Sequence, residues 1–344
     1  MKVLITGGAG FVGVRLARAL LARGVLDGRR IEQLVLSDQV AAPADLLADT
    51  RVQGRVSPLL AACEGLRRTS FDGVFHLASA VSGECEADFD LGLRSNLDST
   101  RALLDALRFQ ATATASGGAA AKPAKLVFSS SIAVFGPDPA YPFPAEVADD
   151  TLPTPQTSYG THKLICEHLV ADYTRKGFID GRAARLMTVT VRPGRPNGAA
   201  SSFFSSIIRE PLAGQDAVCP VSPEVSHPVS SPALTVRGLI TVYEASREAF
   251  VGRTAVNLPG LNVTVQQMLD ALAAVAGPQA RARVRFERDE GIARIVANWP
   301  RGARNGRAAR LGLQPEANFE DIVRQYVADC AAGPDAAAAL KGLN

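Results

Sequence analysis

A glycine-rich turn between the first two expected elements constrains the fold of this chain more than any other feature. Residues Lys2–Thr6 form a short apolar run rich in β-branched residues, and an amphipathic helix is expected over Val14–Arg23. Between these two elements, Gly7, Gly10 and Gly13 follow a GxxGxxG spacing. In a strand-turn-helix unit, glycines at this spacing permit a tight turn, close approach of a pyrophosphate, and close packing of helix on strand. The motif therefore predicts a dinucleotide site, with amides near Phe11 and Val12 directed at the phosphates. A glycine-rich connection without a ligand is the alternative.

Short apolar runs alternate with helical stretches through the first half of the chain. Such alternation predicts right-handed βαβ units and a parallel, doubly wound sheet. A further sheet strand is expected at Leu186–Val191, after a helix over Tyr159–Arg175. We therefore expect an α/β fold, with a Rossmann-type doubly wound parallel sheet and a smaller C-terminal α/β substrate-binding domain. The earlier runs read as strands buried on both faces: Lys2–Thr6, Gln33–Asp38, Gly73–Leu77 and Lys125–Ser129.

An acidic residue ends the second expected strand. Asp38 lies where a carboxylate can accept both hydroxyls of an adenosine ribose, and it would repel a 2′-phosphate. NAD is therefore favoured over NADP as the cofactor. The alternative is a solvated strand end or a cap for the following helix.

A tyrosine and a lysine share one face of a predicted helix. Tyr159 and Lys163 are four residues apart, so their side chains lie one turn apart. A positive charge beside a tyrosine lowers its pKa and makes the phenolate available as a general base. Ser131 follows a predicted buried strand, where its hydroxyl can donate a hydrogen bond to a reacting oxygen. Taken together, these residues predict a catalytic site at the cofactor crevice.

The sequence pattern changes near Val191. The stretch Arg192–Gly198 is too rich in Pro and Gly to continue a strand, and Pro211–Pro232 carries five prolines that predict a long loop. We expect an NAD-binding domain over residues 1–193, with a returning segment around 235–258, and a substrate-binding domain over 194–344. Further elements are expected at Val236–Ser246, Ala255–Leu258, Val265–Ala276, Arg281–Glu287 and Phe319–Asp329.

Composition excludes several classes of function. The 344 residues are 47% apolar and 21% charged, as in a globular protein, and 37 basic against 34 acidic residues leave a net charge of +3. That charge is too small for nucleic acid to be an expected partner. Five widely spaced cysteines without a CxxC pair predict neither a disulfide framework nor a metal site. No signal peptide or membrane span is recognisable, so we expect a cytoplasmic protein without a membrane partner.

The combination of motifs resembles the extended short-chain dehydrogenase/reductases, the NAD-dependent epimerase/dehydratase family. The resemblance implies that Ser131 is the catalytic hydroxyl, that Tyr159 is the base, and that Lys163 also holds the nicotinamide ribose. It further implies a homodimer and a set of cofactor contacts. Leu77, Ala78 and Ala80 would line the adenosine half of NAD, Asn96 would lie near the catalytic centre, and Pro193 would border the nicotinamide. The motifs that carry it are Gly7–Gly13, Asp38, His76–Ala78, Asn96, Phe128–Ser131, Val134–Gly136, Tyr159–Lys163 and Val191–Pro193.

Several reactions use this scaffold, and local residues narrow the choice. Ile132 and Ala133 stand where the 4,6-dehydratases of the family carry an acidic pair, so dehydration is not expected. The stretch His227–Pro232 lacks the arginine and the acid typical of nucleotide-sugar epimerases. Residues Val191–Pro211 and Asn298–Pro300 instead resemble the D-erythronate dehydrogenase branch. That resemblance implies NAD-dependent oxidation of the 2-hydroxyl of a small aldonic acid.

A small sugar acid needs contacts of its own. Arg192 and Arg195 are candidates for binding its carboxylate, or they are structural loop arginines. Ser79 and Ser82 could bind substrate hydroxyls or serve as turn residues, and His227 is a further candidate for substrate contact. A nucleotide-sugar epimerase with tightly bound NAD is the second hypothesis. A non-catalytic NAD sensor is the third, and the retained catalytic residues argue against it.

Overall fold

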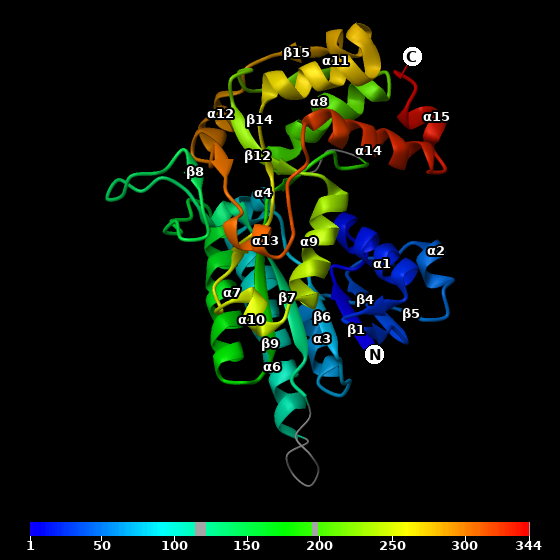
Figure 1. Cartoon of the computed structure of the whole chain (residues 1–344), viewed down its shortest axis with the longest axis vertical. Helices are drawn as coiled ribbons and strands as arrows, with labels where there is room; N and C mark the ends of the chain where they lie inside the picture. Colours follow the sequence, from blue (N-terminus) through cyan, green and yellow to red (C-terminus); the bar gives the residue numbers. More distant parts are fainter. Residues whose placement is uncertain (114–121, 195–198, 344) are drawn as a thin grey trace.

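The described residues, 1–113, 122–194 and 199–343, centre on a parallel sheet of seven strands in a computed structural model of the chain (Figure 1). The strand order reverses beside β1, because the chain moves from β1 outward through two strands and then returns to the other side of β1. This arrangement confirms the predicted Rossmann-type doubly wound fold. The order across the sheet is β13 (Val256–Asn257), β9 (Asp180–Leu186), β7 (Lys125–Ser131), β6 (Gly73–His76), β1 (Lys2–Thr6), β4 (Gln33–Asp38) and β5 (Val52–Val56).

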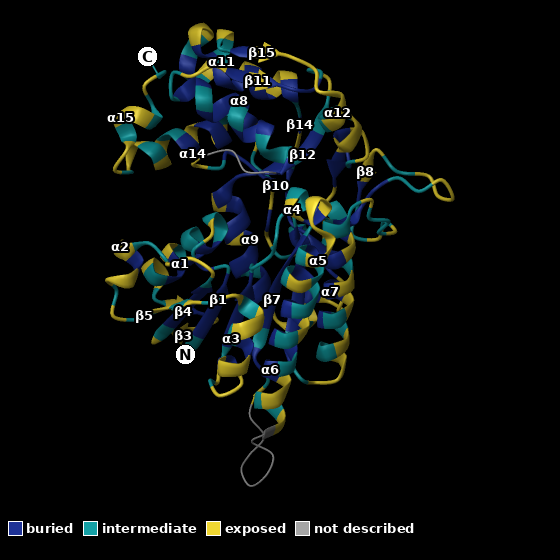
Figure 2. Cartoon of the chain, turned by 180° about the vertical axis from the view of Figure 1, so that it is seen from behind, coloured by how far each residue is buried: buried dark blue, intermediate teal, exposed yellow. Residues whose placement is uncertain are grey.

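Helices cover both faces of this sheet. On one face, α3 (Leu59–Leu66), α6 (Ser99–Ala113) and α7 (Ser158–Arg175) lie side by side. On the other face, α1 (Phe11–Arg23) and α9 (Pro232–Glu244) pack together. Figure 2 shows the buried strands between helices whose outward faces are exposed. Each face of the sheet therefore has its own apolar core.

The C-terminal part lies beyond the carboxyl ends of the sheet strands (Figure 1). Its core joins α8 (Phe203–Leu212), α11 (Val265–Ala282) and α14 (Phe319–Ala331) to the paired strands β11 (Ala217–Cys219) and β15 (Val284–Phe286). A small sheet contains β10 (Thr188–Val189), β12 (Ser226–Ser230) and β14 (Leu261–Thr264). These elements form the smaller α/β part that the sequence predicts.

Short elements complete the described chain. The strand β8 (Glu146–Val147) pairs with β16 (Gly302–Ala303), and β2 (Val25–Leu26) pairs with β3 (Arg29–Arg30). The short helices are α2 (Ala44–Leu47), α4 (Ser82–Ala87), α5 (Phe89–Gly92), α10 (Arg247–Phe250), α12 (Glu290–Ala297), α13 (Gly306–Arg310) and α15 (Ala336–Ala339). A π-helix, η1 (Leu93–Asp98), leads into α6, and the 3₁₀ turns η3 (Ile132–Val134) and η4 (Ala200–Ser202) follow β7 and precede α8.

Two expectations about secondary structure are wrong. The sheet strand expected at Leu186–Val191 is instead β9, which ends at Leu186, and Thr188–Val189 pairs with β12 in the small sheet. Arg182 and Arg185 interrupt the apolar run of β9, so the sequence pattern does not reveal that strand. The long loop expected at Pro211–Pro232 contains β11 and β12. Pro211 lies in the last turn of α8 and Pro232 begins α9, a position that tolerates proline.

None of the described helices is long and apolar enough to cross a membrane. The five cysteines, all within described segments, are free.

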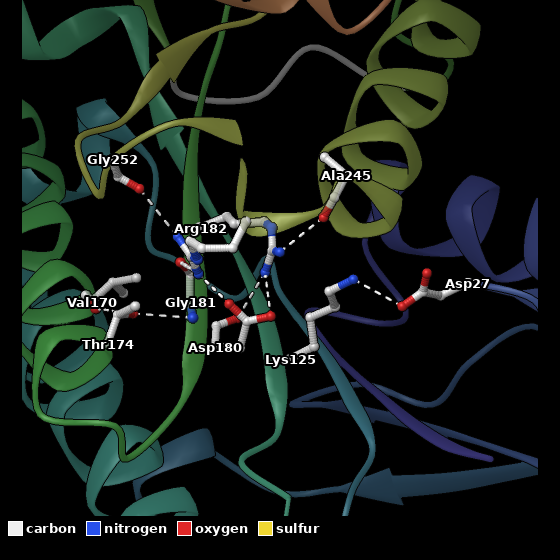
Figure 3. Close-up of polar contacts among 10 residues, drawn as sticks. Asp27, Lys125, Val170, Thr174, Asp180, Gly181, Arg182, Ala245 and Gly252 are labelled. Carbon is white, nitrogen blue, oxygen red and sulfur yellow. Dashed lines mark hydrogen bonds and ion pairs between the residues drawn. The ribbon is translucent and has the colours of Figure 1, made fainter. Parts of the chain in front are cut away.

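A buried arginine joins β9 to the segment after α9 (Figure 3). The Arg182 guanidinium donates to the carbonyl oxygens of Asp180 at 3.1 Å and of Ala245 at 2.9 Å. It also lies 2.9 Å from the Asp180 carboxylate, to which Arg247 donates as well. The Arg182 side chain is 1% exposed. Arg182 thus ties β9 to the end of the helix that covers this part of the sheet.

Replacing Arg182 tests how much this buried contact contributes. Because Arg182→Ala removes a buried ion-pair partner and leaves the Ala245 carbonyl without its donor, we expect the free energy of unfolding to fall by about 3 kcal/mol. Urea denaturation measures the change. Arg175→Ala is the matched control, since Arg175 pairs with Asp172 where both side chains are more than half exposed. That control should cost less than about 1 kcal/mol, and equal losses in both variants would contradict the assignment.

Candidate active site

A cleft of about 1580 Å³ runs along the carboxyl ends of the sheet strands and continues below the C-terminal part. Doubly wound folds bind ligands at this edge, beside the point where the strand order reverses. The cleft brings together most of the residues that the sequence singled out. These are Gly7, Gly10, Phe11, Val12, Gly13, Asp38, Leu77, Ala78, Ser79, Ala80, Ser82, Ser131, Tyr159, Lys163, Arg192 and His227.

The turn between β1 and α1 leaves no room for a side chain at Gly7 or Gly13. Gly7 has a φ of +70°, and a Cβ on it would lie 2.7 Å from the Ala78 amide nitrogen. A Cβ on Gly13 would lie 2.1 Å from the Gly7 carbonyl oxygen. Gly10 caps α1 without a side-chain hydrogen bond, so the first amides of that helix stay available to a ligand. This turn fits the pyrophosphate of a dinucleotide.

The Asp38 carboxylate is held in place at the end of β4. It accepts a hydrogen bond from the Ala9 amide at 3.0 Å and another from the Gln39 amide at 2.7 Å. Each carboxylate oxygen keeps a further lone pair for a hydroxyl donor. Since Asp38 lines the same cleft as the glycine turn, the residues present fit the adenosine ribose and phosphates of NAD.

Asn96 lies behind the cleft rather than in its wall. It is buried in η1, and its side-chain oxygen accepts hydrogen bonds from the Ala80 amide at 2.7 Å and the Ser79 hydroxyl at 3.0 Å. Asn96 therefore fixes the loop that follows β6. Pro193 is exposed, and Arg195 lies outside the described residues. The direct cofactor contacts expected for Asn96 and Pro193 remain predictions.

The close packing of α7 on the end of β7 brings Tyr159 to Ser131. Thr157 caps α7 by accepting from the Gly160 amide at 3.1 Å, and a Cβ on Gly160 would lie 2.1 Å from the Ala133 carbonyl oxygen. The Ser131 side chain lies close enough to Tyr159 to lower its pKa. The Lys163 ammonium donates to the Ser129 carbonyl at 2.8 Å and lies 5.5 Å from the centre of the Tyr159 ring.

The pKa shifts in this group differ from the simple expectation for a tyrosine beside a lysine. Burial raises the pKa of Tyr159, while the Ser131 side chain and the charge of Arg192 act in the opposite direction. Burial also lowers the pKa of Lys163 to about 8, so its ammonium loses part of its charge just above neutral pH. In this arrangement Arg192 is the cation that favours the phenolate.

A buried polar network behind the catalytic residues was not predicted. Glu167 follows Lys163 by one helical turn, and its carboxylate accepts from Arg185 of β9 at 2.9 and 2.8 Å and from Ser130 of β7 at 2.5 Å. Glu167 and Arg185 are each 6% exposed at the side chain. The repeat of Tyr159, Lys163 and Glu167 at four-residue spacing was the available signal for this third residue.

The substrate side of the cleft contains both predicted and unpredicted residues. The Arg192 guanidinium donates to the Val189 carbonyl at 2.9 Å and to the Ser201 hydroxyl at 3.1 Å. His227 lies in β12 rather than in a loop, and both of its ring nitrogens have protein partners. Thr188, Ser201 and Trp299 also line this side, although the sequence assigned them no role.

Residues 3–225, well over half of the chain, match the model of the NAD dependent epimerase/dehydratase family. The chain belongs to this family. It is 46% identical to a D-erythronate dehydrogenase of Cupriavidus necator over 335 residues, which are 96% of this chain and 98% of that protein. It is 41% identical to a D-erythronate dehydrogenase of Haemophilus influenzae, across 95% of this chain and 99% of that one.

A solved structure gives the same result for the fold. The nucleoside-diphosphate-sugar epimerase from Agrobacterium tumefaciens superimposes with a TM-score of 0.87 at 42% identity, across 96% of this chain and 94% of that one. The predicted resemblance to this family and to D-erythronate dehydrogenases is confirmed. This family member is an NAD-dependent oxidoreductase, as expected.

The glycine turn can be tested by filling it. Gly13→Ala places a Cβ against the Gly7 carbonyl, so we expect the turn to shift and NAD affinity to fall more than about 10-fold, the effect of losing well-placed phosphate contacts. Fluorescence titration with NADH measures the Kd. Gly65→Ala in α3 is the control, because a Cβ there meets nothing within 4 Å. Unchanged affinity in a folded Gly13→Ala protein would contradict this site.

Proposed function

We propose that this enzyme oxidises the 2-hydroxyl of a small aldonic acid of the D-erythronate type to the corresponding 2-keto acid. The observation that carries the proposal is the pairing of a base with an anchor in one cleft. Ser131 and Arg192 line the same cleft as Tyr159, and both lie close enough to lower the pKa of that tyrosine. The similarity to two D-erythronate dehydrogenases over nearly the full chain supports the choice of substrate class.

The chain's own residues would divide the work of the reaction. Tyr159, as the phenolate, removes the proton of the 2-hydroxyl, and Ser131 donates a hydrogen bond that positions the same oxygen. When bound, NAD accepts the hydride that leaves C2. Lys163 donates a hydrogen bond to the Ser129 carbonyl at the end of β7 and would bind the nicotinamide ribose. Burial raises the pKa of Tyr159, so the phenolate is the minor form at neutral pH and its fraction grows as the pH rises.

Arg192 is the proposed carboxylate anchor. Two of its nitrogens are already held by the Val189 carbonyl and the Ser201 hydroxyl, so the guanidinium is fixed before substrate arrives. A fixed guanidinium binds a carboxylate with less loss of side-chain freedom than a mobile one. Arg195, Ser79, Ser82 and His227 remain proposed substrate contacts, and the remaining cofactor contacts remain proposed as the sequence assigned them.

Three broader features belong to the same proposal. Residues 1–193 would form the NAD-binding domain and residues 194–344 the substrate-binding domain, with substrate contacts from both, since the cleft is lined from both parts. We also propose a homodimer through α6 and α7, which pack side by side and expose Phe109 and Ile165. A cytoplasmic location completes the proposal and rests on the sequence expectation.

A nucleotide-sugar epimerase is the second candidate function. The 42% identity to the Agrobacterium tumefaciens epimerase favours it. In that reaction the hydride returns to the substrate, so the reduced cofactor does not accumulate.

A substrate panel separates the two candidates. Purified enzyme is mixed with NAD and D-erythronate, other aldonic and uronic acids, or nucleotide sugars, and NADH absorbance is followed. We expect net NADH with D-erythronate, because its hydride is not returned. A protein that forms no NADH with any acid but interconverts a nucleotide sugar would overturn the proposed function.

Removing the proposed base tests the mechanism. Tyr159→Phe deletes only the hydroxyl, so kcat should fall by about 1000-fold or more while the Kd for NADH changes little. Tyr173→Phe is the matched control on the same helix, since its hydroxyl donates to Asp105 at 2.7 Å and neither residue lines the cleft. If Tyr159→Phe keeps full activity, Tyr159 is not the base.

A further inference from the structure

Three residues form a hydrogen-bonded chain on the substrate side of the cleft. The Thr188 hydroxyl lies 2.7 Å from His227 Nε2, and His227 Nδ1 lies 3.0 Å from the Pro300 carbonyl oxygen. All three residues line the cleft. Thr188 is 9% exposed and His227 is 2% exposed.

The chemistry of the partners fixes the direction of both hydrogen bonds. A carbonyl oxygen can only accept, so His227 Nδ1 carries a proton and donates it to Pro300. Burial lowers the pKa of His227 to about 4, so the ring is neutral near pH 7 and Nε2 carries no proton. Nε2 must then accept, and the Thr188 hydroxyl donates its proton to it. The Thr188 hydroxyl can therefore only accept a further hydrogen bond.

The His227 ring is held in this orientation by its neighbours. It stacks on Phe204, with ring centres 5.2 Å apart and an angle of 6° between the planes. The centre of the Trp299 ring also lies 5.2 Å from that of His227, with the two planes tilted by 44°. A side chain packed in this way cannot turn a ring nitrogen toward the substrate without breaking one of its two hydrogen bonds. His227 is thus better placed to act on Thr188 than to contact substrate through a nitrogen.

Thr188 also lies at a defined place relative to the reacting group. Leu186 is the register partner of Ser131, and Thr188 follows two residues later. The Arg192 guanidinium donates to the backbone carbonyl of Val189, the residue that follows Thr188 in the chain. The same cleft is therefore lined by a cation that can only donate hydrogen bonds and by a hydroxyl that can only accept them.

We propose that Thr188 is a specificity-determining residue that accepts a hydrogen bond from a substrate hydroxyl other than the one oxidised, and that His227 is its positioning residue. The inference rests on the proposed function and deepens it. An acid whose carboxylate binds Arg192 would present its further hydroxyls toward Thr188. The site would then select hydroxylated acids over deoxy acids, because an acceptor without a donor partner loses its hydrogen bond on desolvation.

The test compares acids that differ only in hydroxyl groups. The set is D-erythronate, the 2,4-dihydroxy and 2,3-dihydroxy butanoates that lack one hydroxyl each, and 2-hydroxybutanoate, all with the same configuration at C2. We expect wild type to prefer D-erythronate over 2-hydroxybutanoate. Thr188→Val should lower kcat/KM for D-erythronate about 10- to 100-fold and leave 2-hydroxybutanoate within about threefold. Thr188→Ser, which keeps the hydroxyl, should retain most of the preference.

The role of His227 has a separate readout. His227→Phe keeps a ring beside Phe204 but frees the Thr188 proton, so it should weaken the preference for D-erythronate. In the Thr188→Val background the same change should have little further effect on that preference, because His227 acts through Thr188. Additive losses would show that His227 contacts the substrate independently.

Controls separate specificity from folding. Ser226→Ala alters the neighbouring residue of β12, whose hydroxyl donates to the Arg301 carbonyl at 2.8 Å, and should not change the preference. Melting temperature and the Kd for NADH are measured for every variant, and Thr188→Ala replaces Thr188→Val if valine does not fold. An unchanged preference in folded Thr188 variants, or equal losses on all acids, overturns this inference alone. Failure of wild type to oxidise any hydroxylated acid overturns the proposed function and this inference with it.

Discussion

The ion pair between Glu167 and Arg185 is the contact on which the catalytic geometry depends. It joins α7 to β9, and the Ser130 hydroxyl extends it to β7. Removing two charges from water costs several kcal/mol for each ion, so a pair buried to this degree contributes little net stability. Its value is geometric. It holds α7 in a defined position against β7, and that position determines how close Tyr159 lies to Ser131.

The same principle extends across the cleft, where polar side chains are fixed by contacts behind the surface that a ligand would touch. Asp38 is held by two backbone amides, the Ser79–Ala80 loop by Asn96, and Arg192 by a carbonyl and a hydroxyl. Ligands that bind to fixed groups lose less free energy in ordering the protein. The polar side chains of the site are therefore held in position by the fold itself.

The sequence predicted the parts of the molecule that depend on local pattern. The glycine spacing, the carboxylate that ends β4, and the Tyr159 to Lys163 spacing are each set within a few residues, and all lie in one cleft. Strand β9 was misplaced because its charged residues, Arg182 and Arg185, find partners that are distant in the sequence. The hydrogen bond of Thr188 with His227 spans 39 positions. Such a pair depends on how two strands of the small sheet are aligned, which residue spacing alone does not determine.

The path of the chain between its two parts has a consequence for motion. After leaving the sheet at β9, the chain returns to it as α9 and β13, leaves again through β14, and returns once more as α13. Leu239, Val256, Ala308 and Leu313 all pack in the same core as Val3 of the first strand. The C-terminal part is thus attached through several crossings rather than one linker. Rotation about a single hinge is suppressed in such a connection, and any closing of the cleft must come from small displacements of the segments that line it.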